Sequence, residues 1–225
     1  MEQHNERITL KSLVMEAVHA ISHVENGLRR TLIALASNPG KMLRSYLDGR
    51  RSDYQKPFAF LLLSTTLYAI ILHLAHLATN MGDTLPANAD YYTRLAFHAA
   101  HLETAYYSWL HIGLLPFYGL FALIIFFRSK YNYAEWLVIC CYVISFVLLI
   151  LIPYQLVYAV ADFNETVNFV VQLIIVVGYS GYSLGRLEKR SRFNGVLKGA
   201  LYGAVIFTFF YFVVRGIAYY MTVTE

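Results

Sequence analysis

Five long apolar runs restrict what this chain can fold into. Each is close to or above the roughly 20 residues that an α-helix needs to cross the hydrocarbon core of a bilayer. We therefore predict an all-α polytopic membrane bundle of about five transmembrane helices over residues 57–79, 109–127, 134–160, 165–184 and 196–220. Residues 1–56 precede it and form a separate segment of amphipathic cytoplasmic helices.

The composition agrees with lipid as the solvent of much of the chain. Only 14% of the 225 residues are charged and 58% are hydrophobic, whereas a soluble domain carries about 25% charged residues. The two cysteines, Cys140 and Cys141, are adjacent and lie in an apolar run. Adjacent cysteines do not readily bridge each other, so we expect small core residues there.

Lysine and arginine are distributed unevenly about the spans, which predicts the orientation. Nine precede residue 57, two lie at 128–130 and five lie at 186–198. The other two, Arg94 and Arg215, lie toward the opposite side. Because cytoplasmic loops of inner-membrane proteins are enriched in these residues, we expect a cell inner-membrane protein with a cytoplasmic N-terminus and an external C-terminus.

The segment before the first span is basic and amphipathic. Apolar residues recur at helical spacing over residues 10–21 and 28–36, and Pro39 suits the first turn of another helix. Residues 26–56 carry a net charge of +5. An anionic lipid surface is the ordinary partner of such a segment, and an anionic nucleotide or short nucleic acid is the alternative, with phosphate at the Pro39 helix start. The candidate ligand-binding residues are Arg29, Arg30, Lys41, Arg44, Arg50, Arg51 and Lys56.

Residues 27–63 also resemble a known family. The similar positions are Thr31, Leu32, Pro39, Gly40, Tyr46, Gly49, Arg50, Pro57 and Phe58, with a second patch at Tyr133–Leu137. This pattern resembles a widespread family of bacterial membrane proteins catalogued only as a domain of unknown function. Many relatives begin with a cysteine-rich zinc ribbon, whose cysteines are absent here. The resemblance implies a bacterial multi-pass membrane protein and supplies no activity.

Ionisable and amide groups inside spans are costly, so they are candidates for function. Glu135 lies near the start of the third span and Arg215 in the outer part of the fifth. Glu135 could instead pair with Arg128 or Lys130, and Arg215 could extend to the surface or pair with an acidic loop residue. If they line a polar pathway, the residues that would extend it are Gln155, Asn168 and Gln172.

Small residues follow one face of the fifth span. Gly195, Gly199 and Gly203 recur every four residues, which permits close approach of another helix backbone. That helix could be the fourth span of the same chain or a helix of a second subunit. The sequence leaves both alternatives open.

Histidines gather on the outer side. His73 and His76, and His98 and His101, are spaced i, i+3. Paired histidines can bind transition metals, but no recognised ligand motif is matched, so we expect no metal and no other cofactor. No nucleophile elbow, Walker loop or dinucleotide fingerprint is present, and we do not expect an enzyme.

These patterns favour an oligomeric membrane channel or pore-forming effector, with anions as the expected conducted species. Its basic N-terminal segment would receive an anionic regulator, and positive side chains along a pore favour anions. The glycine face of the fifth span would offer contacts for a homo-oligomer. The alternative is a non-transporting membrane scaffold or assembly factor that recruits a lipid or protein partner.

Overall fold

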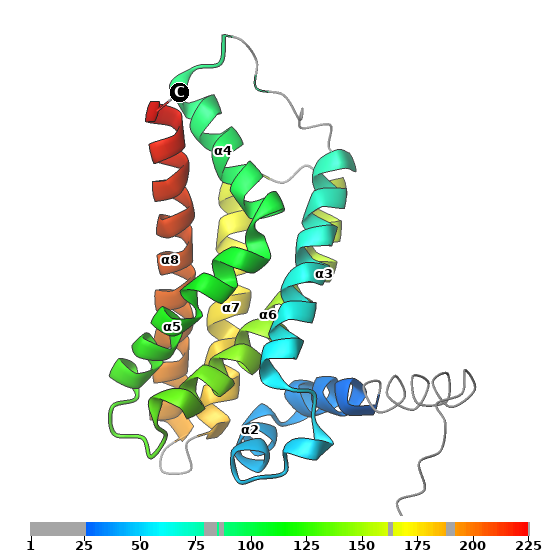
Figure 1. Ribbon diagram of the computed structural model, residues 1–225, viewed down its shortest axis with the longest axis vertical. Helices are drawn as coiled ribbons and strands as arrows, with labels where there is room; N and C mark the ends of the chain where they lie inside the picture. Colours follow the sequence, from blue (N-terminus) through cyan, green and yellow to red (C-terminus); the bar gives the residue numbers. More distant parts are fainter. Residues whose placement is uncertain (1–25, 79–84, 86–87, 162–163, 188–191, 225) are drawn as a thin grey trace, which may run out of the picture.

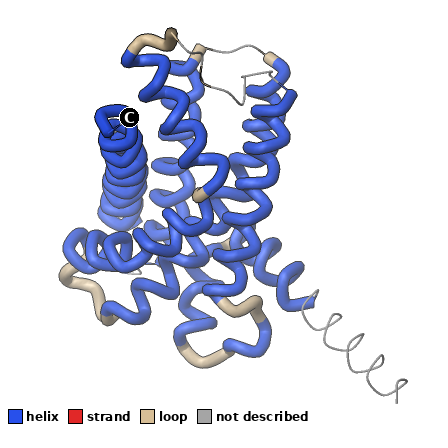
Figure 2. The backbone as a smooth tube through the Cα atoms, turned by 45° about the horizontal axis from the view of Figure 1, so that its top comes forward, coloured by secondary structure: helices blue, strands red, loops and turns tan. Residues whose placement is uncertain are grey.

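The computed structural model describes residues 26–78, 85, 88–161, 164–187 and 192–224. Within these ranges the chain is helical and forms no β-strand. The predicted amphipathic helix over residues 10–21 lies outside the described residues. Figures 1 and 2 show a set of long upright helices with a shorter helical segment lying across one end.

Five helices are long and apolar enough to cross a membrane, as the sequence predicts. They are α3 (Pro57–Ala78), α5 (Tyr107–Ile125), α6 (Tyr133–Val160), α7 (Glu165–Leu187) and α8 (Arg192–Thr224). Their outward surfaces carry exposed apolar side chains, including Leu63, Ile124, Val157, Ile174 and Leu201. Such surfaces are stable in lipid, so the chain is a multi-pass membrane protein.

A further helix, α4 (Tyr91–Ala105), belongs to the bundle although it is too short to be a span. Asp90 caps its first turn, and hydrogen bonds from Thr93 lower the pKa of the Asp90 carboxyl. Ala99 and Leu102 of α4 pack on Val214 and Ala218 of α8. Thus α4 lies along the upper part of α8 in Figure 1 and leads into α5.

The segment before α3 crosses the opposite end of the bundle, which we call the α2 end. It comprises a helix over residues 26–37, α2 (Pro39–Leu47) and a short 3-10 turn, η1 (Arg51–Asp53). The side chain of Asn38 caps α2, with Pro39 in its first turn. Gly49 has a φ of +107°, a conformation that glycine adopts without strain, and it lets the chain turn toward η1. Met42, Leu43 and Tyr46 are buried.

Helix α6 is the most buried span and holds the others together. Its partners change along its length. Trp136 packs on Phe126 at the end of α5, Cys140 meets Tyr202 of α8, and further along Phe146 packs on Tyr179 of α7. Beyond these contacts α6 runs obliquely behind α3. The helices are therefore packed tightly toward the α2 end and diverge toward the end that carries α4, which we call the α4 end.

The glycine face of α8 packs on α7 within the same chain. A β-carbon added at Gly199 would lie 2.6 Å from the Ser180 carbonyl oxygen, and one at Gly203 would lie 2.9 Å from the Val176 carbonyl oxygen. Gly195 is buried on the same helix. Of the two alternatives that the sequence leaves open for this face, the structure forms the intrachain contact.

We predict that Gly199→Ala lowers thermal stability in detergent, by about 1–3 kcal/mol, because the added methyl group meets rigid backbone. Gly178→Ala on α7 is the matched control, since its β-carbon has no atom within 4 Å. It should leave the unfolding temperature unchanged or raise it slightly. Equal unfolding temperatures for both variants would contradict the close helix approach.

Candidate functional site

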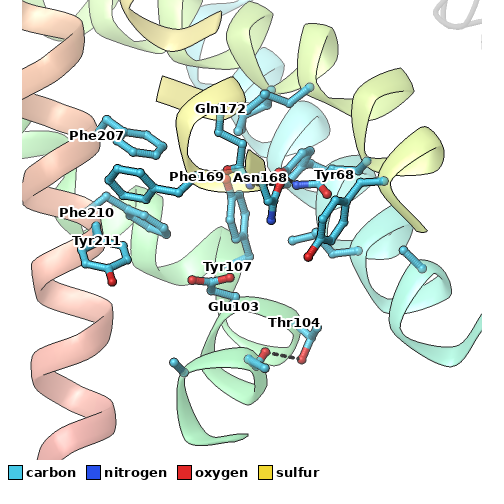
Figure 3. Close-up of a pocket in the computed structure, with 18 of the residues that line it drawn as sticks. Tyr68, Glu103, Thr104, Tyr107, Asn168, Phe169, Gln172, Phe207, Phe210 and Tyr211 are labelled. Atoms are coloured by element: carbon cyan, nitrogen blue, oxygen red, sulfur yellow. Dashed lines mark hydrogen bonds between the residues drawn. The ribbon is translucent and has the colours of Figure 1, made fainter. Parts of the chain in front are cut away.

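A large, partly open cavity of about 1110 Å³ lies where the helices diverge. Residues from α3, α4, α5, α6, α7 and α8 all contribute to its wall. Figure 3 shows aromatic rings, amides and one carboxylate converging on this space from several helices. Four of the five residues predicted to line a polar pathway are in its wall: Gln155, Asn168, Gln172 and Arg215.

One side of the cavity carries a buried polar pair between α3 and α6. The amide nitrogen of Gln155 donates a hydrogen bond of 2.7 Å to the Tyr68 hydroxyl oxygen. Both residues are buried. The bond satisfies the Tyr68 oxygen and part of the Gln155 amide, and it joins the two helices at the α4 end, where α6 has left α7.

An aromatic cluster forms the deepest part of the wall. The rings of Tyr68 and Tyr107 lie 4.8 Å apart, and the His111 ring stacks on Phe210 at 4.4 Å with an interplanar angle of 4°. His111 Nδ1 lies 3.4 Å from the hydroxyl oxygen of Tyr118. His111 Nε2 is buried and has no hydrogen-bond partner among the described residues. A cavity-lining imidazole with an unsatisfied nitrogen is a candidate for contact with a ligand.

Helix α7 contributes two amides to the wall of the cavity. Gln172 donates a hydrogen bond of 2.9 Å to the Asn168 side-chain oxygen, one turn away. Phe169, between them in sequence, packs on Phe207 and Tyr211 of α8. The internal bond leaves further donor and acceptor positions of both amides for water or a ligand.

An arginine and a glutamate, Arg215 and Glu103, also line the cavity. The Arg215 guanidinium lies over the Tyr211 ring, 5.3 Å from its centre. Arg215 is half-buried, and within the described part of the chain no carboxylate forms an ion pair with it. Glu103 lies beside Tyr107 in Figure 3. The cavity thus combines a mostly apolar and aromatic wall with a few separated polar groups, as ligand pockets commonly do.

The cavity is closed toward the α2 end by packed side chains. Tyr202 and Cys140 are buried, and the Tyr202 oxygen lies 2.9 Å from the Cys140 sulfur. Tyr118 is only 1% exposed and lies between the cavity and this pair. Below them, Tyr142 is fully buried and packs on Tyr46 of α2. Among the described residues, these buried side chains form a packed layer between the cavity and α2.

Glu135, the fifth pathway candidate, lies away from the cavity and has a structural contact. Its side chain accepts a hydrogen bond of 2.8 Å from the Asn132 backbone N–H, and the Asn132 side chain accepts one of 2.9 Å from the Glu135 N–H. This is a capping box that begins α6. The Asn-x-x-Glu spacing is a sequence signal for it, and neither Arg128 nor Lys130 is needed.

The N-terminal segment is docked on the α2 end of α7 by hydrogen bonds in both directions. Arg44 donates to the carbonyl oxygens of Arg186 and Leu187, the second at 3.0 Å. Tyr182 and Arg186 donate to the Ser37 carbonyl oxygen at 2.9 and 3.2 Å. We call this arrangement the clasp. It satisfies carbonyl groups that the ends of two helices leave without intrahelical partners.

The clasp occupies the position where the sequence suggested a phosphate. Gly40 is buried, and a β-carbon there would overlap the Arg186 backbone. The Asn38 side chain already accepts a hydrogen bond from the Lys41 N–H. The first turn of α2 therefore faces α7 and its own cap.

The other predicted ligand-binding residues lie on the exposed side of the docked segment. Only Arg44 of the seven is half-buried. Arg30 lies 3.7 Å from Asp53, an exposed pair of small energetic value. The remaining side chains are exposed and lie on the helix over residues 26–37, on α2 and before α3: Arg29, Lys41, Arg50, Arg51 and Lys56.

The histidines do not converge on one metal centre. His98 is buried, whereas His73 and His101 are exposed, and the side chain of His76 lies outside the described residues. Among the residues that the structure describes, no three histidine, cysteine, aspartate or glutamate side chains are grouped closely enough to hold a metal ion. Sequence reasoning did not identify a different feature, the aromatic and polar wall around Tyr68, Tyr107 and His111.

The chain was compared with known protein families, curated proteins and solved structures. A family described as "Protein of unknown function (DUF3667)" matches residues 25–69. No curated protein and no solved structure matches the chain. The matched stretch covers the docked segment and the first half of α3, and it includes Arg44 of the clasp but no cavity residue other than Tyr68.

The cavity predicts a pattern of thiol reactivity in nanodiscs. A hydrophilic maleimide should label Gln172→Cys, because Gln172 lines the cavity, but not Ile174→Cys on the lipid-facing side of α7. Cys140 and Cys141 are at most 4% exposed, so the parent protein should remain unlabelled. If Gln172→Cys reacted as slowly as the parent, the cavity would not admit water.

The clasp predicts a local effect on stability. Arg44→Ala removes the donor to two carbonyl groups and should weaken protection of residues 39–47 against hydrogen exchange, by about 1–2 kcal/mol. Lys41→Ala, on the exposed face of the same helix, is the control and should change protection little. Equal protection in the two variants would show that the clasp does not hold α2.

Proposed function

We propose that this chain is a membrane channel whose pathway runs within a single chain, with the cavity as its outer vestibule. The observation that supports it is the convergence of Gln155, Asn168, Gln172 and Arg215 on one space walled by all six upright helices. Polar groups inside a membrane bundle are costly, and their gathering around a shared cavity is typical of a pathway. We further propose that the membrane is a bacterial inner membrane and that the α2 end faces the cytoplasm, as the lysine and arginine distribution predicts.

In this proposal the described conformation is closed. The layer around Tyr118, Tyr202 and Cys140 blocks the cavity toward the α2 end. Opening would require the helices to separate there, and α6 and α8 are the pair joined by the Cys140–Tyr202 contact. A pathway that is wide at one end and sealed by packed side chains at the other is consistent with a gated conduit.

The clasp supports regulation from the cytoplasmic side. Arg44 and Arg186 join the basic segment to α7, and α7 carries Asn168 and Gln172 into the cavity wall. An anionic ligand bound to the exposed basic side chains would therefore act on a helix that forms the pathway. A nucleotide or short nucleic acid remains our proposed ligand class at this surface.

We propose a preference for anions because Arg215 lies in the cavity wall. It is the one lysine or arginine of the cavity wall in the described chain, and it lacks a carboxylate partner there. Glu103 is the one carboxylate of that wall and is placed on α4. Assembly into a homo-oligomer also stays a proposal, and it would use a face other than the glycine face of α8, which α7 covers.

A second candidate function is a membrane scaffold that recruits anionic lipid. The specific observation is that the basic side chains before α3 are exposed beside the exposed Phe58 at the start of that helix. Basic groups next to an apolar anchor bind anionic headgroups. This candidate needs no transport, so it predicts lipid binding with no flux.

The test is anion flux into liposomes that contain the purified full chain. We expect chloride flux above that of empty liposomes, reduced several-fold in Arg215→Gln because the vestibule loses its positive charge. Arg128→Gln is the matched control, because Arg128 is exposed and lies in the loop between α5 and α6. Its flux should equal that of the parent.

Flux should be measured with and without a nucleotide or short oligonucleotide on the cytoplasmic side. Absence of flux under every condition would overturn the channel proposal and favour the scaffold. Flux that is the same in the parent and in Arg215→Gln would retain the channel but remove Arg215 from its pathway.

A further inference from the structure

We propose that the cavity binds an amphipathic organic anion: a carboxylate on an aromatic or similarly planar apolar body. This inference rests on the proposed function in placing the ligand on the pathway, but it concerns binding alone. It assigns Arg215 as the counter-ion and the aromatic wall as the surface for the apolar body.

The charge of the ligand follows from Arg215. A half-buried guanidinium within a span and without an ion-pair partner in the described chain is energetically unfavourable. The central carbon of the guanidinium lies over the Tyr211 ring, 5.3 Å from its centre, and this contact leaves guanidinium N–H groups to donate. A carboxylate matches the edge of a guanidinium, because two parallel N–H···O bonds can form.

The apolar body follows from the rest of the wall. Tyr68, Tyr107 and Phe210 present ring surfaces, and the aliphatic side chains Leu148 and Leu151 of α6 complete that side. Here the polar groups are separated by rings, an arrangement that suits a planar organic molecule with few polar atoms.

The imidazole of His111 adds a polar contact for the ligand. His111 Nδ1 lies 3.4 Å from the Tyr118 hydroxyl oxygen, and which of the two donates depends on the tautomer of the ring. His111 Nε2 is buried without a hydrogen-bond partner among the described residues. A polar group of an occupant of the cavity would supply one, and in the tautomer with a proton on Nε2 a carboxylate oxygen would accept from it.

The cavity is large enough for such a ligand and for additional water molecules. Pockets for small organic molecules commonly enclose about 300–1,000 Å³, and this cavity, at about 1110 Å³, is slightly larger. The amides of Asn168 and Gln172 also lie in the wall and can hold bridging water between ligand and protein.

The experiment measures binding of naphthoate to the full chain in nanodiscs by equilibrium dialysis, with empty nanodiscs as the background. Naphthamide, which has the same ring system and no charge, is the matched probe. We expect naphthoate to bind at least tenfold more tightly than naphthamide to the parent. Arg215→Gln should abolish that preference, and Arg128→Gln should retain it.

Arg215→Lys keeps the charge but not the two-pronged geometry, and it should retain part of the preference. The parent comparison needs no variant, so it tests the proposal even if Arg215→Gln does not fold. Equal binding of naphthoate and naphthamide to the parent would overturn the proposal. So would an unchanged naphthoate preference in a folded Arg215→Gln protein.

The two proposals fail separately. Chloride flux without a naphthoate preference would contradict the organic-anion site and support the channel. The opposite result is a naphthoate preference that is lost in Arg215→Gln, with no flux of any anion. It would support the binding site and contradict the channel.

Discussion

The contacts of α6 decide the shape of this bundle. Toward the α2 end this helix touches α5 through Trp136, α8 through Cys140 and α7 through Phe146. Further along, the Gln155–Tyr68 bond joins it to α3. Because α6 departs from α7 while keeping α3, the space between the two sides of the bundle widens toward the α4 end. The cavity is the consequence, and its polar lining comes from the helices that face each other across it.

The stretch that matches the family of unknown function has a structural explanation for several of its positions. The Thr31 hydroxyl oxygen accepts a hydrogen bond from the Gln55 N–H, Gly40 admits the Arg186 backbone, and Tyr46 packs edge-on against Tyr142. The first contact joins two parts of the amphipathic segment, and the other two attach that segment to the bundle. Residues with such contacts hold a segment in place, and that role does not indicate a ligand. The family match therefore corresponds to a docked structural unit and does not identify what the unit binds.

The spans were predictable because hydropathy is a local property, and all five helices begin and end within a few residues of the predicted bounds. The short helix α4 was not predictable as part of the bundle, because Arg94, Glu103 and its histidines make it too polar for a hydropathy signal. The cavity could be anticipated only as a set of polar residues on separate spans. Which of these polar residues come into contact depends on helix tilt, which the sequence does not give. Gln155 therefore bonds to Tyr68, whereas Glu135 caps the start of its own helix.

Helix α7 connects the two features that matter most for function. At one end Tyr182 and Arg186 bond to the docked segment, and roughly 20 Å away along the same helix Asn168 and Gln172 line the cavity. Its long contact with α8 depends on glycines, so the two backbones lie too close for α7 to shift sideways without carrying α8 with it. Movement at the clasp would therefore displace α7 and α8 together against α6. Such a displacement would strain the contacts that join α6 to these two helices, Phe146–Tyr179 and the Cys140–Tyr202 pair below the cavity.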